Sequence, residues 1–535
     1  MNFSSLEYPY PSKRNLLYSN RGMVATSQPL AAQAGLDMLK KGGNAVDAAI
    51  ATAACLTVVE PTSNGIGGDA FAIIWIDGEL HGLNASGPAP EALSLEYFEK
   101  QGLKEMPTFG PIPITVPGVP AAWAALSERF GNLSLKTVLK PSIQYARNGF
   151  PITPATAYFW NKAYQNALTN YQGDIFNPWF QTFAPEGRAP MAGEMWKSEG
   201  HAKTLEAIAK SEGRDFYEGE LADKIDAFLT KHQGKLKKKD LEQYKVRWEK
   251  PVSVSYRGYD VWEIPPNGQG MIALQALAIL QGMEPQPVEN EEATHQIIEA
   301  LKLAFVDGTT HIADPDHMKS SLEDLLSEEY IQSRRKLIGK TAIMPEPGFP
   351  PRSGTVYMAA ADGEGNMVSM IQSNYMGFGS GVVVPETGIA LHNRGHNFSL
   401  DPRHPNCLAP GKRPYHTIIP GFLTKDGQAM GPFGVMGGFM QPQGHLQLLT
   451  KIIDFKLNPQ AALDAPRWQW LGGKKIEVEQ NYPETLIQQL AERGHDISLQ
   501  RERGSFGRGQ MILRNETGVL CGATEPRTDG YVAVW

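Results

Sequence analysis

The sequence predicts an α+β fold in which stacked β-sheets are flanked by helices. Helical periodicity dominates the first two-thirds of the 535 residues, and alternating strand patterns begin the last third. Hydrophobic residues make up 41% of the chain, which is ample for a large core. The length allows either about two to four domains or one large layered unit.

The first two helices are predicted from their capping residues and glycine ends. We expect Thr26 or Ser27 to cap a helix that stops at Gly42-Gly43. Asn44 then caps an alanine-rich helix over residues 45–59, whose small side chains favour close packing. Further helical patterns cover residues 120–130, 135–148, 202–212, 219–233, 237–246, 270–283, 292–306, 445–454 and 459–464.

Strand patterns concentrate after residue 354. Residues 355–361 and 366–373 alternate like two strands of a hairpin joined at 362–365. Earlier in the chain, the segment EPTSNGIGGDAFAIIW, residues 60–75, predicts a glycine-rich turn that leads into a buried strand. Residues 155–200 are aromatic and irregular, and the pattern assigns no element to them. Shorter strands are expected at residues 382–384, 389–391, 417–424 and 430–435.

Composition and charge exclude several classes of protein. A net charge of −7 argues against a nucleic-acid binder, which would normally present a basic face. Cys55, Cys407 and Cys521 lack CxxC spacing, so we expect free thiols in a reducing compartment. The N-terminus has no apolar signal segment, and the apolar run 45–59 is too short to span a bilayer. We therefore expect a cytoplasmic protein with no nucleic-acid or membrane partner.

Motifs for metals and cofactors are weak. The sequence has no HExxH, Walker A or G-x-S-x-G motif, and the glycines of 377–381 lack the spacing of a phosphate loop. His311, Asp314, Asp316 and His317 could hold a metal ion, although such mixtures more often make loop hydrogen bonds. We therefore predict no metal and no cofactor.

A proline-rich stretch, residues 341–354, ends directly before the strand that Thr355 opens. Taken alone, such a stretch is typical of an inter-domain linker or hinge. A threonine hydroxyl needs an adjacent base, and the α-amino group of a terminal threonine, with a pKa of about 8, can be that base. Attack of the Thr355 hydroxyl on the Gly354 carbonyl would create this terminus. We therefore predict a cleavage site between Gly354 and Thr355, with Thr355 as the catalytic nucleophile.

Amide cleavage also needs an oxyanion hole, which is a set of preorganised hydrogen-bond donors. Gly437 and Gly438 directly follow a predicted strand. Paired glycines allow two backbone N–H groups to turn towards a substrate. A plain turn explains the same two glycines equally well.

Several blocks of the sequence, in order, resemble the γ-glutamyltranspeptidase family of N-terminal-nucleophile hydrolases. The blocks are EPTSNGIGGDAF (60–71), YRGYDVWEIPPNGQG (256–270), GTVYMAAADGEGN (354–366), SNYMGFGSG (373–381), GKRPYHTIIP (411–420), GVMGG (434–438), APRW (465–468) and GATEPRTDG (522–530). Thr355 stands in the nucleophile's place, Ser373 where the family places a supporting hydroxyl, and Gly437 and Gly438 at its oxyanion hole. The resemblance covers nearly the whole chain and implies a four-layer αββα fold.

The resemblance also implies self-cleavage into two subunits. Residues 1–354 would form the large subunit, and residues 355–535 would form the small subunit that carries the nucleophile. The two would be each other's partners in a heterodimer that is one catalytic unit, with a dimer of heterodimers as a further way of assembling. Thr355 would form an acyl-enzyme that water or an acceptor amine resolves.

The substrate-binding positions depart from the family pattern. Typical members hold the glutamate α-amino group with Asn, Gln or Glu, and Asp, where this sequence has Tyr375, Arg394 and Asn397. A serine pair that binds the α-carboxylate is replaced by His416-Thr417, and an early arginine by Ser86. Arg394 would repel an ammonium group and attract a carboxylate.

The set Tyr375, Arg394 and Asn397 is similar to the oxamate amidohydrolase subgroup, whose members release ammonia and oxalate. We therefore predict hydrolysis of a small anionic amide, with oxamate as the first candidate. Two alternatives stay open: a γ-glutamyl hydrolase or transferase acting on glutathione-like amides, and a non-catalytic relative that binds a small anion. Arg394 could instead form a surface ion pair. His396 and His416 could be pocket residues or simple hydrogen bonders.

Overall fold

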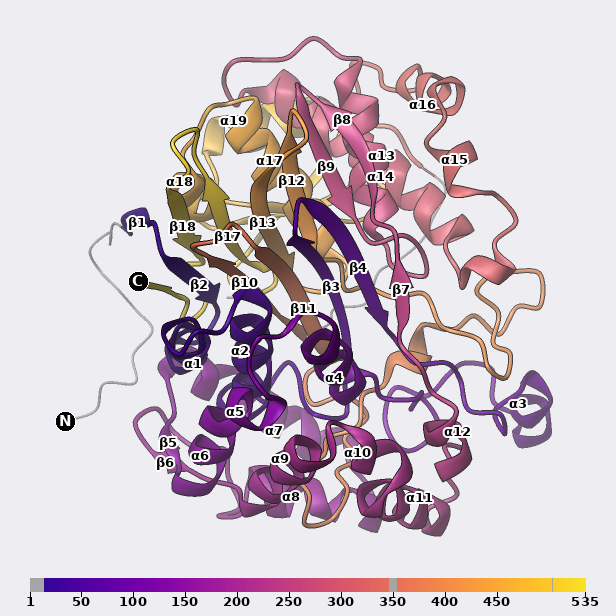
Figure 1. The fold of residues 1–535 in the computed structure, drawn as a ribbon. Helices are drawn as coiled ribbons and strands as arrows, with labels where there is room; N and C mark the ends of the chain where they lie inside the picture. Colours follow the sequence, from indigo (N-terminus) through magenta and orange to yellow (C-terminus); the bar gives the residue numbers. More distant parts are fainter. Residues whose placement is uncertain (1–13, 346–353, 503) are drawn as a thin grey trace.

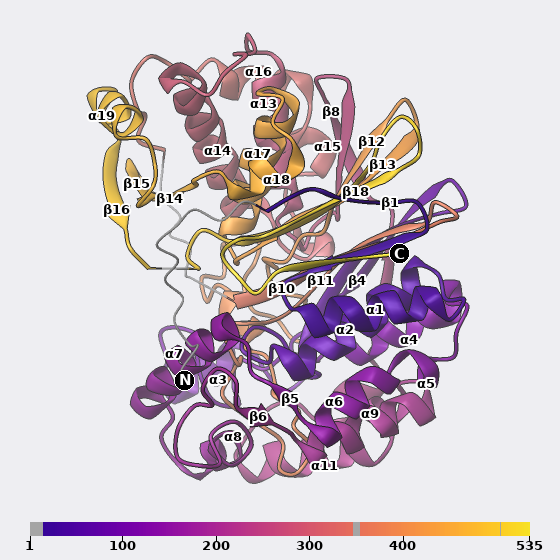
Figure 2. The same ribbon diagram turned by 90° about the vertical axis from the view of Figure 1, so that its left-hand side faces the viewer.

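The computed structural model describes residues 14–345, 354–502 and 504–535, which form four layers (Figure 1). Two antiparallel, seven-stranded β-sheets stack face to face, and helices cover the outer face of each sheet (Figure 2). The layers therefore run helix, sheet, sheet, helix. This confirms the α+β fold with αββα layers that the sequence predicts.

The sheet that contains Thr355 carries it on a central strand. Its strands, in spatial order, are β19 (Tyr531–Val534), β2 (Gly22–Thr26), β10 (Gly354–Asp362), β11 (Met367–Tyr375), β3 (Asp69–Ile76), β4 (Glu79–Ala85) and β7 (Arg247–Glu249). The second sheet consists of β1 (Leu17–Ser19), β18 (Leu520–Thr524), β17 (Arg508–Arg514), β13 (Gln428–Met436), β12 (Gly421–Lys425), β9 (Tyr259–Glu263) and β8 (Val252–Tyr256). Two small sheets are formed by β5 (Phe150–Pro151) with β6 (Met195–Trp196), and by β14 (Trp468–Gly472), β15 (Lys475–Glu479) and β16 (Asp496–Gln500).

The helices divide between the two outer layers (Figure 2). The layer on the Thr355 sheet includes α1 (Pro29–Lys40), α2 (Ala45–Val59), α4 (Val119–Phe130), α5 (Leu135–Val138), α6 (Lys140–Asn148), α7 (Pro154–Asn170), α8 (Asn177–Phe183), α9 (Glu199–Ser211) and α11 (Glu220–Lys231). The opposite layer contains α13 (Gly270–Gln281), α14 (Glu291–His311), α15 (Leu322–Leu325), α16 (Glu328–Arg335), α17 (Met440–Ile453), α18 (Pro459–Asp464) and α19 (Glu484–Glu492). The shorter helices α3 (Leu95–Gln101), α10 (Arg214–Glu218) and α12 (Lys238–Glu242) complete the set. None of the described helices is long and apolar enough to cross a membrane.

Strand β10 contributes side chains to two separate cores. Val356 and Met358 belong to the core shared with α1 and α2, whereas Tyr357 and Ala359 belong to the core between the two sheets. Successive strand residues point to opposite faces, so Thr355 lies on the same face as Tyr357, towards the second sheet. The alternation places the predicted nucleophile in the sandwich interior.

Most predicted elements are present, and the hairpin of β10 and β11 is confirmed. Asn44 caps α2, since its side-chain oxygen accepts the Val46 and Asp47 N–H groups. The predicted cap of α1 is wrong, because neither Thr26 nor Ser27 serves; these residues belong to β2 and the bend after it. The Gln28 side chain accepts the first free N–H groups of α1 instead.

Other differences follow from long-range packing. The unassigned aromatic segment contains α7 and α8, where Phe183 meets Trp160 edge to face and Trp179 at a tilt of 52°. Residues 382–384 and 389–391 form isolated bridges, between Val383 and Ala390 and between Leu391 and Gly67, rather than two strands. The predicted helix over 135–148 is interrupted at Leu139, the predicted helix over 237–246 is shorter, and the strand predicted over 417–424 begins at Gly421. Much of the proline-rich stretch lies outside the described residues.

The two sheets approach closely at Gly434, which gives a testable consequence. A Cβ atom at Gly434 would lie 2.3 Å from the Tyr357 ring, so the ring or a strand would have to shift. We expect Gly434→Ala to lower the melting temperature, because overpacking of this kind costs about 1–3 kcal/mol. Thermal denaturation of the purified protein measures the change. Gly339→Ala is the matched control, since nothing lies within 4 Å of its Cβ position; equal melting temperatures for Gly434→Ala and this control would contradict the tight contact.

Candidate active site

Thr355 lies near the start of β10, where the strand pairing is irregular. The register between β10 and β11 shifts between Gly354 and Val356. The Thr355 side chain is fully buried, and its hydroxyl lies 3.1 Å from the Ser373 hydroxyl. The Ser373 hydroxyl also accepts the backbone N–H of Tyr375 at 2.8 Å. Strand irregularities commonly re-aim a side chain beside an active site. The structure therefore brings the predicted nucleophile and its predicted supporting hydroxyl together.

Gly437 and Gly438 form the turn between β13 and α17. Their φ angles of +141° and +62° lie in the left-handed region that favours glycine. Met440 begins the 14-residue helix α17, so both glycines lie at the positive end of a helix dipole. Close packing of Gly434 on Tyr357 stacks β13 over β10. Backbone N–H groups in this turn can stabilise an oxyanion.

Arg394 is the central charged residue of the predicted substrate site. Its side chain is fully buried, and its Nη1 donates to the Thr417 hydroxyl at 2.7 Å. The guanidinium lies 4.4 Å from the Tyr375 ring centroid, and Nε lies 3.7 Å from Oδ2 of Asp69. Neither Nε nor Nη2 makes a hydrogen bond to any described residue. The alternative of a surface ion pair is therefore wrong, because the pair with Asp69 is buried and incomplete.

Asp69, which opens β3, lies close to two further side chains, those of His416 and His392. His416 accepts the Ile418 backbone N–H at Nδ1, so its Nε2 carries the proton and donates to Asp69 Oδ2 at 2.9 Å. The Nδ1 of His392 lies 3.6 Å from the same carboxylate oxygen. Asp69 pairs with Ser373 in the strand register, so this charge cluster lies beside the residue whose hydroxyl contacts Thr355.

Burial controls the protonation of this cluster. Desolvation raises the pKa of Asp69 to about 7, although the Arg394 charge opposes the rise. Burial, together with the charge of Arg394, holds the pKa of His416 well below its usual range and lowers the pKa of His392 to about 3. Burial also lowers the pKa of Arg394 to about 10. At neutral pH the site therefore contains a charged guanidinium, two neutral imidazoles and a carboxyl group near its midpoint.

Two other predicted substrate residues lie in the same region. The Tyr375 side chain is buried, its hydroxyl has no hydrogen-bond partner among the described residues, and its φ of +75° is strained for a non-glycine residue. The Asn397 amide donates to the Tyr415 carbonyl at 2.9 Å, which ties it to the loop before His416. His396 contacts the Met106 carbonyl through Nδ1 at 2.9 Å.

Ser86 does not take over the role of an early arginine. Its hydroxyl donates to the Asn84 side chain at 2.7 Å, and Asn267 donates back to it at 3.2 Å. The Ser86 side chain therefore makes hydrogen bonds only to uncharged amide groups among the described residues, and all three side chains are buried. The Ser86 carbonyl also accepts a hydrogen bond from Nε of the buried Arg413 at 2.9 Å, so a positive charge lies beside this position in addition to that of Arg394.

Sequence reasoning missed two residues that hold this site together. Asp69 lies within the glycine-rich block and opens β3, but its partners are hundreds of residues away. Gln269 donates from Nε2 to the Thr417 and Gly438 carbonyls at 2.7 and 2.8 Å. The sequence offered one signal for them: each lies next to a glycine in a block that resembles the family. Asp69 follows Gly68, and Gln269 lies between Gly268 and Gly270.

A pocket of about 370 Å³ opens beside Gly437. Much of its wall is aromatic, from Phe109, Phe159, Tyr171, Phe378, Phe439 and Trp470. Lys162 and Arg508 also line the pocket, but Lys162 pairs with Glu502 of the same wall. Nη1 of Arg508 lies 3.3 Å from Oε1 of Glu60, and the Arg508 guanidinium lies 4.4 Å from the Phe159 ring centroid. The pocket has room for a group much larger than a two-carbon acid.

The described residues hold a group of potential metal ligands away from this site. His295, Glu299 and His495 bring their ligand atoms within 4.8 Å of one another. However, His295 Nδ1 already lies 2.9 Å from His495 Nε2, and Lys302 Nζ lies 2.7 Å from Glu299 Oε1. A buried ammonium at this carboxylate opposes cation binding.

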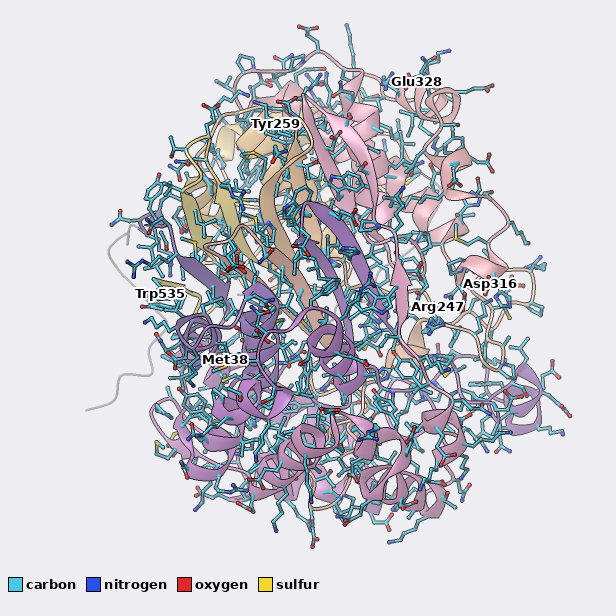
Figure 3. The ribbon with its side chains drawn as sticks, viewed as in Figure 1. Met38, Arg247, Tyr259, Asp316, Glu328 and Trp535 are labelled. Atoms are coloured by element: carbon cyan, nitrogen blue, oxygen red, sulfur yellow. The ribbon has the colours of Figure 1, made fainter. Side chains whose placement is uncertain are left out.

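In the segment from His311 to His317, the two aspartates contact arginine residues. Asp314 accepts the Arg413 backbone N–H at 2.8 Å and lies 3.4 Å from Arg247. Arg247 also pairs with Asp316 at 3.8 Å, and the two are labelled at the same edge of the molecule (Figure 3). The two aspartates therefore anchor this edge of the fold.

Comparisons with known proteins agree with the fold and with the family that the sequence blocks resemble. The family model described as gamma-glutamyltranspeptidase matches residues 31–535. Glutathione hydrolase-like YwrD proenzyme of Bacillus subtilis is 37% identical, over 95% of this chain and 97% of that protein. Oxamate amidohydrolase proenzyme of Klebsiella pneumoniae is 33% identical, over 96% of this chain and 98% of that protein.

A solved structure, described as cephalosporin acylase from Bacillus halodurans, is 60% identical. It matches with a TM-score of 0.97 and covers 100% of this chain and 99% of its own. The family match, the relatives and the αββα layers all point to one kind of enzyme, an N-terminal-nucleophile amidohydrolase. The chain therefore belongs to the gamma-glutamyltranspeptidase family.

Proposed function

We propose that this protein is a self-processing threonine amidohydrolase of a small anionic amide, with oxamate as the first substrate to test. The observation that carries the substrate class is the buried Arg394 guanidinium. Its Nη2 has no hydrogen-bond partner among the described residues, and its Nε reaches only Asp69. A substrate carboxylate at Nη2 would complete a charge-assisted hydrogen bond that the protein leaves open.

Processing would begin at the peptide bond between Gly354 and Thr355. The Thr355 Oγ attacks the Gly354 carbonyl carbon, the C–N bond breaks, and the α-amino nitrogen takes the proton. Water then hydrolyses the resulting ester, which leaves residues 1–354 with a new carboxylate and residues 355–535 with a free threonine terminus. The word proenzyme in the names of two relatives supports this step.

Turnover would use the α-amino group that processing releases. This amine accepts the Thr355 hydroxyl proton while Oγ attacks the amide carbon of the substrate. The N–H groups of Gly437 and Gly438 stabilise the oxyanion, and the C–N bond breaks as the α-ammonium group returns its proton to the leaving nitrogen, which departs as ammonia. Water attacks the acyl-enzyme in the same way and releases the acid. For oxamate, the products are ammonia and oxalate.

The buried charge also bears on the γ-glutamyl alternative. A free α-amino group beside Arg394 would place two positive charges in a dry site. Asn397 cannot offset this charge, because it is neutral and its amide is bound to the Tyr415 carbonyl. To distinguish the two proposals, oxamate and glutathione are each supplied at a saturating concentration. Release of ammonia from oxamate and of glutamate from glutathione is then measured. Turnover of glutathione without oxamate would overturn the first choice.

The 370 Å³ pocket beside Gly437 favours a second candidate, an amide with a larger acyl group. Its aromatic wall suits an amide with an apolar acyl chain. The similarity to a structure described as a cephalosporin acylase supports testing such amides alongside oxamate and glutathione. Binding of a small anion without turnover by fully cleaved protein would favour the non-catalytic alternative instead.

Replacing the nucleophile tests processing and turnover together. We expect Thr355→Ala to remain a single chain of 535 residues, because the attacking oxygen is gone. Wild type should give two species in denaturing intact-mass spectrometry, one of which begins at Thr355. Thr355→Ser is the matched control, since it keeps a hydroxyl and should still be cleaved. A cleaved Thr355→Ala protein would place the nucleophile elsewhere.

Replacing the buried cation tests the substrate class. Arg394→Gln should raise KM for oxamate roughly 10- to 150-fold, because a charge-assisted hydrogen bond contributes about 1.5–3 kcal/mol. Steady-state ammonia release measures the change, with intact mass showing that the variant is still processed. Arg403→Gln is the control, because Arg403 is exposed and pairs only locally with Asp401. An unchanged KM for Arg394→Gln would exclude substrate contact.

The raised pKa of Asp69, about 7, predicts how binding depends on pH. Below this pH Asp69 is neutral, so the Arg394 charge is fully available to an anionic substrate. Above it the ionised Asp69 competes for that charge, so KM for oxamate should rise as pH increases through about 7, by about tenfold or less. Steady-state assays between pH 5.5 and 8.5 measure this trend. Asp69→Asn keeps an acceptor for His416 and should flatten it; an equally steep rise in Asp69→Asn would assign the titration to another group.

A further inference from the structure

Gln269 lies directly behind the Gly437-Gly438 turn and is fully buried. Its Nε2 donates to the Gly438 carbonyl at 2.8 Å and to the Thr417 carbonyl at 2.7 Å. Its Oε1 accepts the Tyr415 hydroxyl at 2.9 Å. One side-chain amide thus joins the turn to the segment that carries the predicted substrate residues.

These partners determine the orientation of the Gln269 amide. Two carbonyl oxygens can only accept, so the atom that faces both of them must be the NH₂ group. That nitrogen has two protons, and each has one acceptor. The backbone reinforces this position, because the Gln269 N–H donates to the His416 carbonyl and the His416 N–H donates to the Asn267 carbonyl. Both the side chain and the backbone of Gln269 therefore hydrogen-bond to the segment that contains Tyr415, His416 and Thr417.

Tyr415 adds a second restraint to the same turn. Its ring is stacked on Phe439 with centroids 5.8 Å apart and an interplanar angle of 21°. Phe439 directly follows Gly438 and is the N-cap residue of α17. The Gly438 carbonyl also accepts the Gln441 N–H at 3.1 Å. The peptide between Gly438 and Phe439 is therefore held by two hydrogen bonds and a ring contact.

A turn of two glycines needs such restraints. Glycine populates left-handed and right-handed backbone conformations almost equally, so its peptide planes can rotate at little cost. An oxyanion hole works only when its N–H groups already point at the developing charge. External hydrogen bonds can supply the order that the glycine backbone lacks.

We propose that Gln269, supported by Tyr415, is the positioning residue that keeps the Gly437-Gly438 turn in its oxyanion-binding orientation. The inference rests on the proposed roles of Thr355 and the two glycines. Gln269 holds the Gly438 carbonyl, which belongs to the peptide directly after the two proposed donor N–H groups, so it acts by restraining the backbone next to them and touches no reacting atom. If the chain is cleaved after Gly354, Gln269 belongs to the large subunit and the turn to the small one. The large subunit would then complete the oxyanion hole of the small subunit.

The experiment measures acylation of Thr355 by p-nitrophenyl acetate, a general acyl donor that does not depend on the natural substrate. The Thr355 oxygen attacks the acetyl carbonyl carbon, p-nitrophenolate leaves, and the α-amino group takes the proton. Released p-nitrophenolate gives the single-turnover rate, and intact mass locates the acetyl group on the chain that begins at Thr355. Varying the ester concentration separates the limiting rate from the apparent dissociation constant.

We expect Gln269→Met to lower the limiting acylation rate about 10- to 100-fold, since loss of one oxyanion donor itself costs about 100- to 1,000-fold. The apparent dissociation constant should change less than about threefold, because ground-state binding does not use the oxyanion contact. Gln275→Met is the matched control. Gln275 is also buried in the α13 region, but it donates to Asp307 and the Leu325 carbonyl, and its variant should react like wild type.

A second variant decides the question if Gln269→Met fails to fold or to be cleaved. Tyr415→Phe keeps the ring on Phe439 and removes only the hydroxyl that orients Gln269, and it should slow the limiting rate by about threefold or more. Acylation of Gln269→Met at the wild-type rate, or a fall equal to that of Gln275→Met, would overturn the inference alone. Wild type that is cleaved but takes no acetyl group on Thr355 would overturn the proposed function as well.

Discussion

The pairing of β10 with β11 is the constraint on which the rest of the site depends. It places the Thr355 hydroxyl 3.1 Å from the Ser373 hydroxyl, at a register shift near the start of β10. Alternate residues of β10 are anchored in two different cores. A slip of one residue would move every one of these side chains to the wrong face. The position of the nucleophile is thus set by the hydrophobic packing of the strand that follows it.

The second organising feature is the cost of burying charge. Arg394 and Asp69 are both removed from water, and neither completes its hydrogen bonds within the described residues. Such a pair is a poor source of stability, because desolvation offsets much of the attraction. Under the proposed function the pair serves recognition, because a substrate anion would complete hydrogen bonds of a guanidinium that folding has already removed from water. Burial lowers the pKa values of His392 and His416, so both imidazoles are neutral and the Arg394 guanidinium carries the positive charge of this cluster.

Local sequence patterns predicted the elements well and their contacts poorly. The α2 helix and the hairpin after Gly354 are where capping and alternation place them, because a few adjacent residues specify both. The aromatic segment after α6 was unreadable, since its helices are stabilised by rings that meet across distant turns. Gln28 caps α1 because β2 holds Thr26 in extended conformation, which is a tertiary constraint on a local choice.

The sequence by itself determined the order of the blocks, the glycine pair after β13 and the presence of Arg394 where the family resemblance leads us to expect an ammonium-binding residue. It is also the source of the proposal that Thr355 becomes a terminal nucleophile. These are properties of residue types and their neighbours along the chain. Only the tertiary structure decided that Arg394 is buried against Asp69, that His416 donates to the same carboxylate, and that Gln269 supports Gly438. Each of these contacts joins residues more than 150 positions apart, and hydrogen bonds over such separations exist only after the two sheets have packed together.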